Sequence, residues 1–314
     1  MPSPATSTPQ PVRIAAADAV HDATLYRATT KKHKVEPPAL VLHLHAGAFV
    51  SAPTMGTPCI VRLLLEAGAT VLSLRYPLAP EHPFPQAPEA AFAALTHLYK
   101  HRRSYAGSPA RVFLAGEEAG GNLAAAAALM ARDRGGPEIA GQLLFSPMLD
   151  VCVATASMRG VHAGPVGCRF ADGWRSYLPR ASDALHPYAT PGSAVRLASL
   201  PPTLLVTSKD DPMRDEAEAY AQRLRHEGIA VEELVLTPHT GFPGPYMETS
   251  ACDAEWMRAV HAPIRRFLQS PGTPPDFEDP TTMTDMTRGV IDEARKPRDD
   301  ANREPANPNR RTTP

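Results

Sequence analysis

Apolar runs and segments of helical periodicity alternate along this chain between Leu40 and Leu268. The segments predicted as strands are 23–29, 40–45, 69–75, 111–115, 139–145, 202–207 and 230–237. Those predicted as helices are 86–103, 122–134, 213–227 and 253–269, and Gly68 and Gly228 stand where helices would end. Such alternation is typical of a parallel sheet covered by helices on both faces. The sequence therefore predicts an α/β fold with a doubly wound, mostly parallel sheet.

The composition predicts a single folded domain with a short head and a long tail. The chain has 314 residues, of which 43% are apolar, enough to bury one large core. Residues 1–11 hold four prolines and are predicted to be disordered, and 12–269 are predicted to form the domain. Residues 270–314 are rich in Pro and charged side chains and poor in large apolar ones, so we expect a mobile or loosely docked tail.

The net charge and the positions of the cysteines limit the kinds of molecule that this chain is expected to bind. The net charge is −1, and no run of Lys or Arg is long enough to favour nucleic acid or an anionic membrane. No apolar stretch approaches the roughly 20 residues of a membrane helix, so we expect a cytoplasmic protein. The four cysteines lack metal-like spacing with His, so we expect free thiols, no metal and no organic cofactor. A small-molecule substrate fits this composition best.

The most informative segment is 111–123, Arg-Val-Phe-Leu-Ala-Gly-Glu-Glu-Ala-Gly-Gly-Asn-Leu. A predicted strand leads into glycines and then directly into an Ala-rich helix, which is the context of the nucleophile elbow G-x-S-x-G. In that motif the central residue sits on a sharp turn with its side chain above the sheet. Here the central residue is Glu118.

Four motifs in order give a resemblance to the hormone-sensitive-lipase-like family of α/β-hydrolase-fold esterases. Residues 116–123 match the family's G-[D/E]-S-A-G-G-N-L except at the serine, and His-Ala-Gly-Ala-Phe at 45–49 is similar to its HGGGF motif. Residues 78–85 read Leu-Ala-Pro-Glu-His-Pro-Phe-Pro, and 211–216 are similar to D-P-L-R-D-E. The resemblance implies Asp211 as the triad acid and the N–H groups of Ala46, Gly47 and Ala119 as oxyanion donors. It also admits a homodimer paired through edge strands.

The triad departs from the family at two of its three positions. Glu118 replaces the serine, and the family's H-G-F reads His239-Thr240-Gly241-Phe242 here. Either His239 is displaced by one residue and still serves as the base, which we favour, or Thr240 replaces it.

Three roles for Glu118 follow from carboxylate chemistry. As a general acid and base it would move protons on a carbonyl compound in an isomerisation, elimination or cyclisation, the reading we favour. As a nucleophile it would form an ester that an activated water must cleave, acting on an ester, lactone or epoxide. As a non-catalytic residue it would fill a pocket used only for binding. Fold alone does not choose between these roles.

The substrate is expected to be small and largely apolar, with a carbonyl, ester or lactone group. Residues 151–185 are expected to form a lid or substrate segment, in which Phe170, Trp174 and Tyr177 either line the site or pack a lid helix. Phe49 and Phe242, from the HGGGF-like and H-G-F-like motifs, complete the predicted substrate-binding residues.

Overall fold

The computed structural model describes residues 8–15, 19–27, 36–53, 56–107, 110–152, 154–160, 164–237, 240–247 and 254–273. Residues 1–273 form one compact unit. Residues 274–314, which hold nearly all of the predicted tail, lie outside the described residues.

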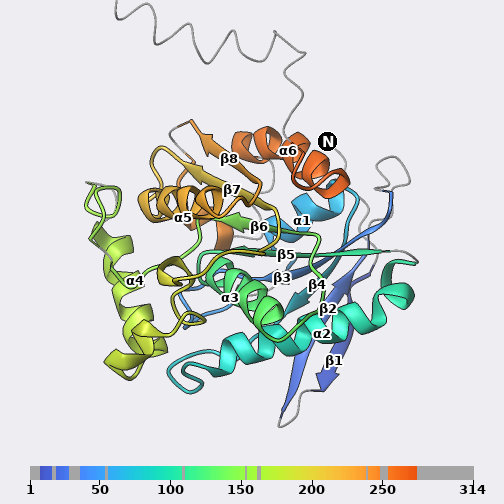
Figure 1. Ribbon diagram of the computed structural model, residues 1–314, viewed down its shortest axis with the longest axis horizontal. Coiled ribbons are helices and arrows are strands. Elements are labelled where there is room, and N and C mark those ends of the chain that lie inside the picture. Colours follow the sequence, from blue (N-terminus) through green and yellow to red (C-terminus); the bar gives the residue numbers. More distant parts are fainter. Residues whose placement is uncertain are drawn as a thin grey trace, which may run out of the picture. The chain divides into compact units, whose positions relative to one another are not determined.

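An eight-stranded sheet forms the centre of this unit (Figure 1). In spatial order its strands are β1 (Gln10–Ala15), β2 (Val20–Tyr26), β4 (Thr70–Leu74), β3 (Ala39–Leu44), β5 (Arg111–Glu117), β6 (Gly141–Phe145), β7 (Thr203–Ser208) and β8 (Val231–Leu236). β1 and β2 pair antiparallel to each other, β2 pairs antiparallel to β4, and the remaining pairs are parallel. Every residue of β3, β6 and β7 is buried, as expected for strands covered on both faces. The predicted fold class is confirmed.

Helices cover both faces of the sheet and create two apolar layers. α1 (Cys59–Glu66) and α6 (Glu255–Gln269) share one buried cluster, and in Figure 1 they lie above the sheet. α2 (Gln86–Ala106), α3 (Ala119–Asp133) and α5 (Arg214–His226) pack on the other face. α4 (Gly164–Tyr177) lies to one side of the sheet, and short 3₁₀ turns occupy Ala181–Leu185, Pro191–Ser193 and Gly244–Met247.

The observed elements differ from the predicted ones mainly at the N-terminal half. β1 begins at Gln10, inside the segment expected to be disordered, because its pairing with β2 satisfies its backbone. α1 was anticipated only through Gly68, since its eight residues include six buried ones and give a nearly continuous apolar run. α3 begins at Ala119 rather than at Asn122, directly behind Glu118.

Two glycines allow the sharp turn between β5 and α3. A Cβ on Gly116 would lie 2.1 Å from the carbonyl oxygen of Gly120, and a Cβ on Gly120 would lie 1.9 Å from the carbonyl oxygen of Leu44. Real Cβ atoms do not come this close to backbone oxygen. The chain can therefore double back at Glu118 only with glycine at both positions.

Candidate active site

Glu118 occupies a strained turn above the sheet. Its φ is 52° and its ψ is −117°, a region that non-glycine residues rarely adopt. The Glu118 N–H donates to Phe145 O at 3.1 Å, and its carbonyl oxygen accepts from Met148 N at 3.0 Å and Asn122 N at 3.1 Å. These bonds over-determine the backbone, which is how a strained conformation at a functional position persists.

The Glu118 carboxylate is fully buried and has donors on both oxygens. Oε2 accepts hydrogen bonds from Gly47 N at 2.8 Å and Ala48 N at 3.2 Å, and Oε1 contacts the guanidinium of Arg169 on α4. Burial raises the pKa of Glu118 above its ordinary value, and Arg169 and the two amides oppose that rise. The carboxylate thus has one oxygen anchored to backbone and the other paired with a partly exposed side chain.

The turn after β3 presents consecutive N–H groups to two neighbouring carboxylates. Gly47, Ala48 and Phe49 all have positive φ, at 130°, 50° and 66°. Ala46 N donates to Glu117 Oε1 at 3.2 Å, on the other side of the turn from Glu118. The donors to the Glu118 carboxylate are therefore Gly47 and Ala48, whereas the N–H of Ala46, a predicted oxyanion donor, is bonded to Glu117. Ala119, also predicted, is buried as the first residue of α3.

Glu117 supports the same turn through a buried histidine. His43 Nε2 lies 3.0 Å from Glu117 Oε2 and 3.2 Å from Oε1, and His43 Nδ1 lies 2.9 Å from Ser73 Oγ. His43, Glu117 and the backbone of Ala46 thus form one connected group under the turn. Glu117 and Glu118 are neighbours on a sharp turn, where side chains diverge. Both carboxylates nevertheless accept hydrogen bonds from N–H groups of the turn after β3.

His45 is placed as a residue that orients this turn. Its Nδ1 lies 2.7 Å from Ala46 O, and its ring stacks on Tyr76 with centroids 4.1 Å apart. Burial lowers the pKa of His45 to about 4, so the imidazole is neutral near pH 7.

The predicted acid Asp211 is buried and bonded to groups other than a histidine. Ser146 donates to Asp211 Oδ2 at 2.5 Å, and Met213 N donates to Oδ1 at 2.9 Å. Ser146 Oγ also lies 2.9 Å from Tyr246 OH. Burial raises the pKa of Asp211 to about 7. The site thus holds two buried carboxyl groups, Glu118 and Asp211, that both retain protons to higher pH than usual.

The two candidates for the triad histidine position are only partly described. His239 lies outside the described residues. Thr240 Oγ1 lies 2.8 Å from Ser208 Oγ and 2.9 Å from Asp210 Oδ1. Its hydroxyl therefore faces Asp210 rather than the predicted acid Asp211.

Four of the five predicted substrate-binding aromatic residues gather where α4 meets the turn after β3. Phe49 and Tyr177 stack with centroids 4.0 Å apart and an interplanar angle of 2°, and Trp174 lies 5.0 Å from Phe49. Phe170 is buried in the same cluster. Phe242 instead packs with Tyr246 and Trp256 in the cluster on the other face of the sheet.

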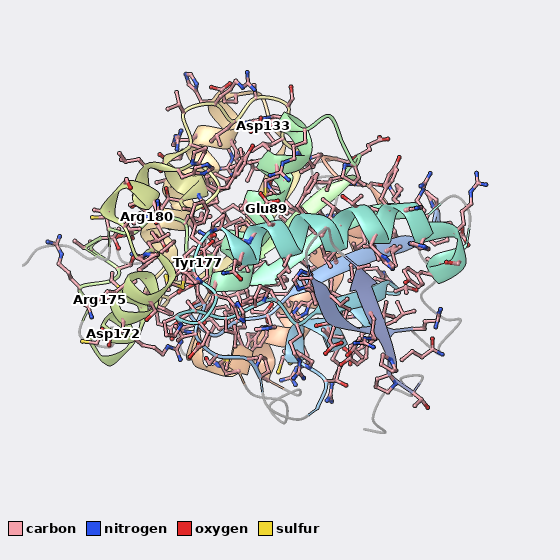
Figure 2. The ribbon with its side chains drawn as sticks, turned by 90° about the horizontal axis from the view of Figure 1, so that it is seen from below. Glu89, Asp133, Asp172, Arg175, Tyr177 and Arg180 are labelled. Carbon is pink, nitrogen blue, oxygen red and sulfur yellow. The ribbon has the colours of Figure 1, made fainter. Side chains whose placement is uncertain are left out.

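α4 lies directly against the turn that holds Glu118. A Cβ on Gly173 would lie 2.4 Å from Ala48 O, so the helix backbone reaches the turn without an intervening side chain. Figure 2 shows Tyr177 turned towards the body and Asp172 and Arg175 on the outer side of this helix. Arg169 precedes Gly173 by one helical turn and lies on the same face.

Three residues that contact Glu118 or Asp211 were not predicted from the sequence: Arg169, Ala48 and Ser146. Gly173, four residues after Arg169, was the available signal for Arg169, because a small residue permits close approach of a helix.

The described residues contain no group of three or more His, Cys, Asp or Glu side chains that could hold a metal ion. None of the described helices is long and apolar enough to cross a membrane.

An open groove of about 1460 Å³ runs along α2, away from Glu118. Its lining includes Tyr76, Leu78, Phe92, His97 and His101 and none of the predicted site residues. Size alone would make it the candidate site, but the buried carboxylates, the strained elbow and the converging amides all lie at Glu118. We therefore place the chemistry at the elbow.

Comparison with known proteins identifies the family of the chain. A family model described as alpha/beta hydrolase fold matches residues 41–240. The chain is 34% identical to Esterase LipI of Mycobacterium tuberculosis over 229 residues, which is 70% of this chain and 71% of that protein. It is 37% identical to Carboxylic ester hydrolase LipN of the same organism over 202 residues, 62% of this chain and 54% of that protein.

Solved structures give the same result in three dimensions. The hyperthermophilic esterase from Pyrobaculum calidifontis superposes with a TM-score of 0.69 at 30% identity, covering 83% of this chain and 85% of that one. Sequence, topology and structural similarity agree over the region that contains the elbow, the turn after β3 and Asp211. The chain belongs to the α/β-hydrolase fold family, as one of its esterase-like enzymes.

Proposed function

We propose that Glu118 replaces the serine nucleophile of the family and acts as a general acid and base on a small, largely apolar carbonyl, ester or lactone compound. The observation that carries this proposal is the asymmetry of its carboxylate. One oxygen is anchored by Gly47 and Ala48, and the other contacts the partly exposed guanidinium of Arg169. A general base must lie within hydrogen-bond reach of the proton that it abstracts, and Oε1 is the oxygen that the backbone amides leave to a substrate.

The backbone amides that bind Glu118 are not available to hold negative charge on the substrate. In the family these N–H groups are implied to stabilise a substrate oxyanion, but here Gly47 and Ala48 donate to Glu118 itself. The charge of an enolate or alkoxide must therefore be met by another donor, and Arg169 is in position to supply it. Isomerisation, elimination and cyclisation are the reactions that this pair supports.

A second candidate function, with Glu118 as a nucleophile, is favoured by the same anchored oxygen. Gly47 and Ala48 would stabilise the oxyanion formed when water cleaves a glutamyl ester. That step needs a base to activate the water. Among the described candidates, Asp211 and Thr240 are both bonded to other groups, and His239 lies outside the described residues. We rank proton transfer first because it requires only Glu118 and Arg169.

The test uses hydrogen exchange and ester cleavage on one set of variants. The native protein, Glu118→Gln and Glu118→Ser are incubated in D₂O with a panel of small ketones, keto acids and lactones, and exchange at the carbon next to the carbonyl is followed by NMR. We expect exchange with the native protein and a loss of about 10²-fold or more in Glu118→Gln, the usual contribution of a general base. Full exchange in Glu118→Gln would refute the proposal.

Short-chain p-nitrophenyl esters separate the alternatives. If Glu118→Ser alone cleaves them, the remaining site is competent for hydrolysis and Glu118 has diverted it. If the native protein cleaves esters or epoxides and peptide mass spectrometry finds an adduct on Glu118, the nucleophilic function replaces our proposal. Saturable ligand binding with no product in any variant would indicate a binding protein.

A further inference from the structure

Arg169 and Glu118 differ sharply in their exposure to solvent. The Arg169 side chain is 42% exposed, whereas the Glu118 carboxylate that it contacts is fully buried. A guanidinium has five N–H donors, and the contact with Glu118 uses Nη2. Arg169 therefore offers a charged, partly open donor surface immediately in front of the proposed reacting oxygen.

The helix that carries Arg169 is fixed, so the side chain is the part that can move. Gly173 places the backbone of α4 against Ala48, and Tyr177 stacks on Phe49. These two contacts hold the helix against Ala48 and Phe49, in the turn that binds Glu118. A substrate can reach Glu118 Oε1 if the Arg169 guanidinium swings towards solvent, with α4 remaining in place.

We propose that Arg169 binds a carboxylate of the substrate, so that the substrate class is a small carbonyl compound that carries a carboxylate group. The planar guanidinium matches a carboxylate with two parallel hydrogen bonds, as it does in many acid-binding sites. The substrate carboxylate would replace Glu118 as the partner of Arg169 and leave Oε1 facing the substrate. The Arg169 guanidinium lies 5.0 Å from the centre of the Phe170 ring, and a cation beside an aromatic ring favours an anion with an apolar body.

The exchange of partners also prepares the proton transfer. Glu118 Oε1 takes a proton from the carbon next to the carbonyl. The electron pair of that C–H bond forms a carbon–carbon double bond, and the π electrons of the carbonyl move to its oxygen. Arg169 stands beside the resulting negative charge, and the proton then returns to the same or a neighbouring carbon. This part of the inference rests on the proposed function, whereas the binding of carboxylates by Arg169 does not.

The experiment measures binding of butyrate and phenylacetate, with butyramide and phenylacetamide as uncharged controls, by calorimetry at fixed ionic strength. In Glu118→Gln the competing carboxylate is neutral, so we expect carboxylates to bind about tenfold more tightly than to the native protein. In the double variant Glu118→Gln/Arg169→Leu we expect that gain to be lost, with an affinity for carboxylates at least tenfold lower than in Glu118→Gln. The double variant leaves no buried charge unpaired, so it avoids the folding defect expected of Arg169→Leu alone.

Arg175→Leu is the matched control on the same helix. Arg175 lies on the outer side of α4, where it pairs with Asp172 and is 76% exposed, and its removal should leave carboxylate affinity unchanged (Figure 2). Equal affinity in Glu118→Gln and the double variant would overturn the inference, as would no carboxylate binding to Glu118→Gln. If carboxylates require Arg169 but no exchange occurs in D₂O, the proposed function fails and this inference stands.

Discussion

Alanine at Gly173 should weaken the contact between α4 and the turn that holds Glu118. The added Cβ would lie 2.4 Å from Ala48 O and 3.0 Å from Ala48 Cβ. Because the nearer atom belongs to the backbone, relief requires the helix or the turn to shift. Overpacking of this kind costs about 1–3 kcal/mol, and the gain in helix propensity over glycine is about 1 kcal/mol. We expect a net loss of up to about 2 kcal/mol in the free energy of unfolding.

Gly167 provides the control within the same helix. A Cβ there would lie 3.5 Å from Met158 Sδ, an ordinary contact, so Gly167→Ala should gain up to about 1 kcal/mol. The difference in the free energy of unfolding between the two variants therefore gives the cost of the clash alone, about 1–3 kcal/mol. Since each kcal/mol shifts the Tm of a domain of this size by about 2–4 °C, Gly173→Ala should melt about 2–12 °C below Gly167→Ala. Thermal melts followed by circular dichroism measure this, and a Gly173→Ala variant that melts at or above the control refutes the close contact.

Three further predictions concern the buried carboxyl groups. The pKa of Asp211 is raised from 3.8 to about 7, so the folded state holds this proton more tightly, and the associated stability is present below about pH 4 and lost as the pH rises through 7. Urea unfolding of Asp211→Asn should therefore lose less stability than the native protein between pH 5 and pH 8, by up to about 3 kcal/mol, and an equal loss would contradict the raised pKa. Ser146→Ala removes the donor to Asp211 and should lower the free energy of unfolding by about 1–3 kcal/mol in urea titrations; no change would show that this bond contributes nothing. Glu117→Leu leaves His43 Nε2 and the Ala46 N–H without their acceptor and should cost at least about 2 kcal/mol, whereas Glu117→Gln keeps one acceptor and should cost less; equal losses would argue against this pairing.

The fold was predictable because strand and helix patterns alternate with clear punctuation. The strands from β3 to β8 lie within about two residues of their predicted bounds, since continuous apolar runs mark strands buried on both faces. β1 was missed because it is short and lies at the sheet edge, where five of its six residues are exposed or half-buried. Its formation depends on pairing with β2, which a local pattern does not show.

The candidate site was predictable at the elbow and less so around it. Glu118 followed from glycine spacing between a strand and a helix, both local features. Which amide faces which carboxylate depends on the positive φ values of Ala48 and Phe49, which oppose the local preference of those residues. Arg169 lies 51 positions from Glu118, and its contact is set by the packing of α4. Gly173 indicates that this helix packs closely on another element, but not which side chain it brings to Glu118.

The arrangement at Glu118 explains why the proposed chemistry differs from ester cleavage. In a serine-based site, amides such as those of Gly47 and Ala48 meet a negative charge only in the transition state, and they therefore lower the barrier. With Glu118 in place they already bind its carboxyl group in the resting state, so they contribute nothing differential to a substrate oxyanion. Any reaction that develops charge on the substrate must then use a donor outside this turn. Among the described groups in contact with Glu118, Arg169 is the one whose positive charge can move from the resting carboxylate to the substrate.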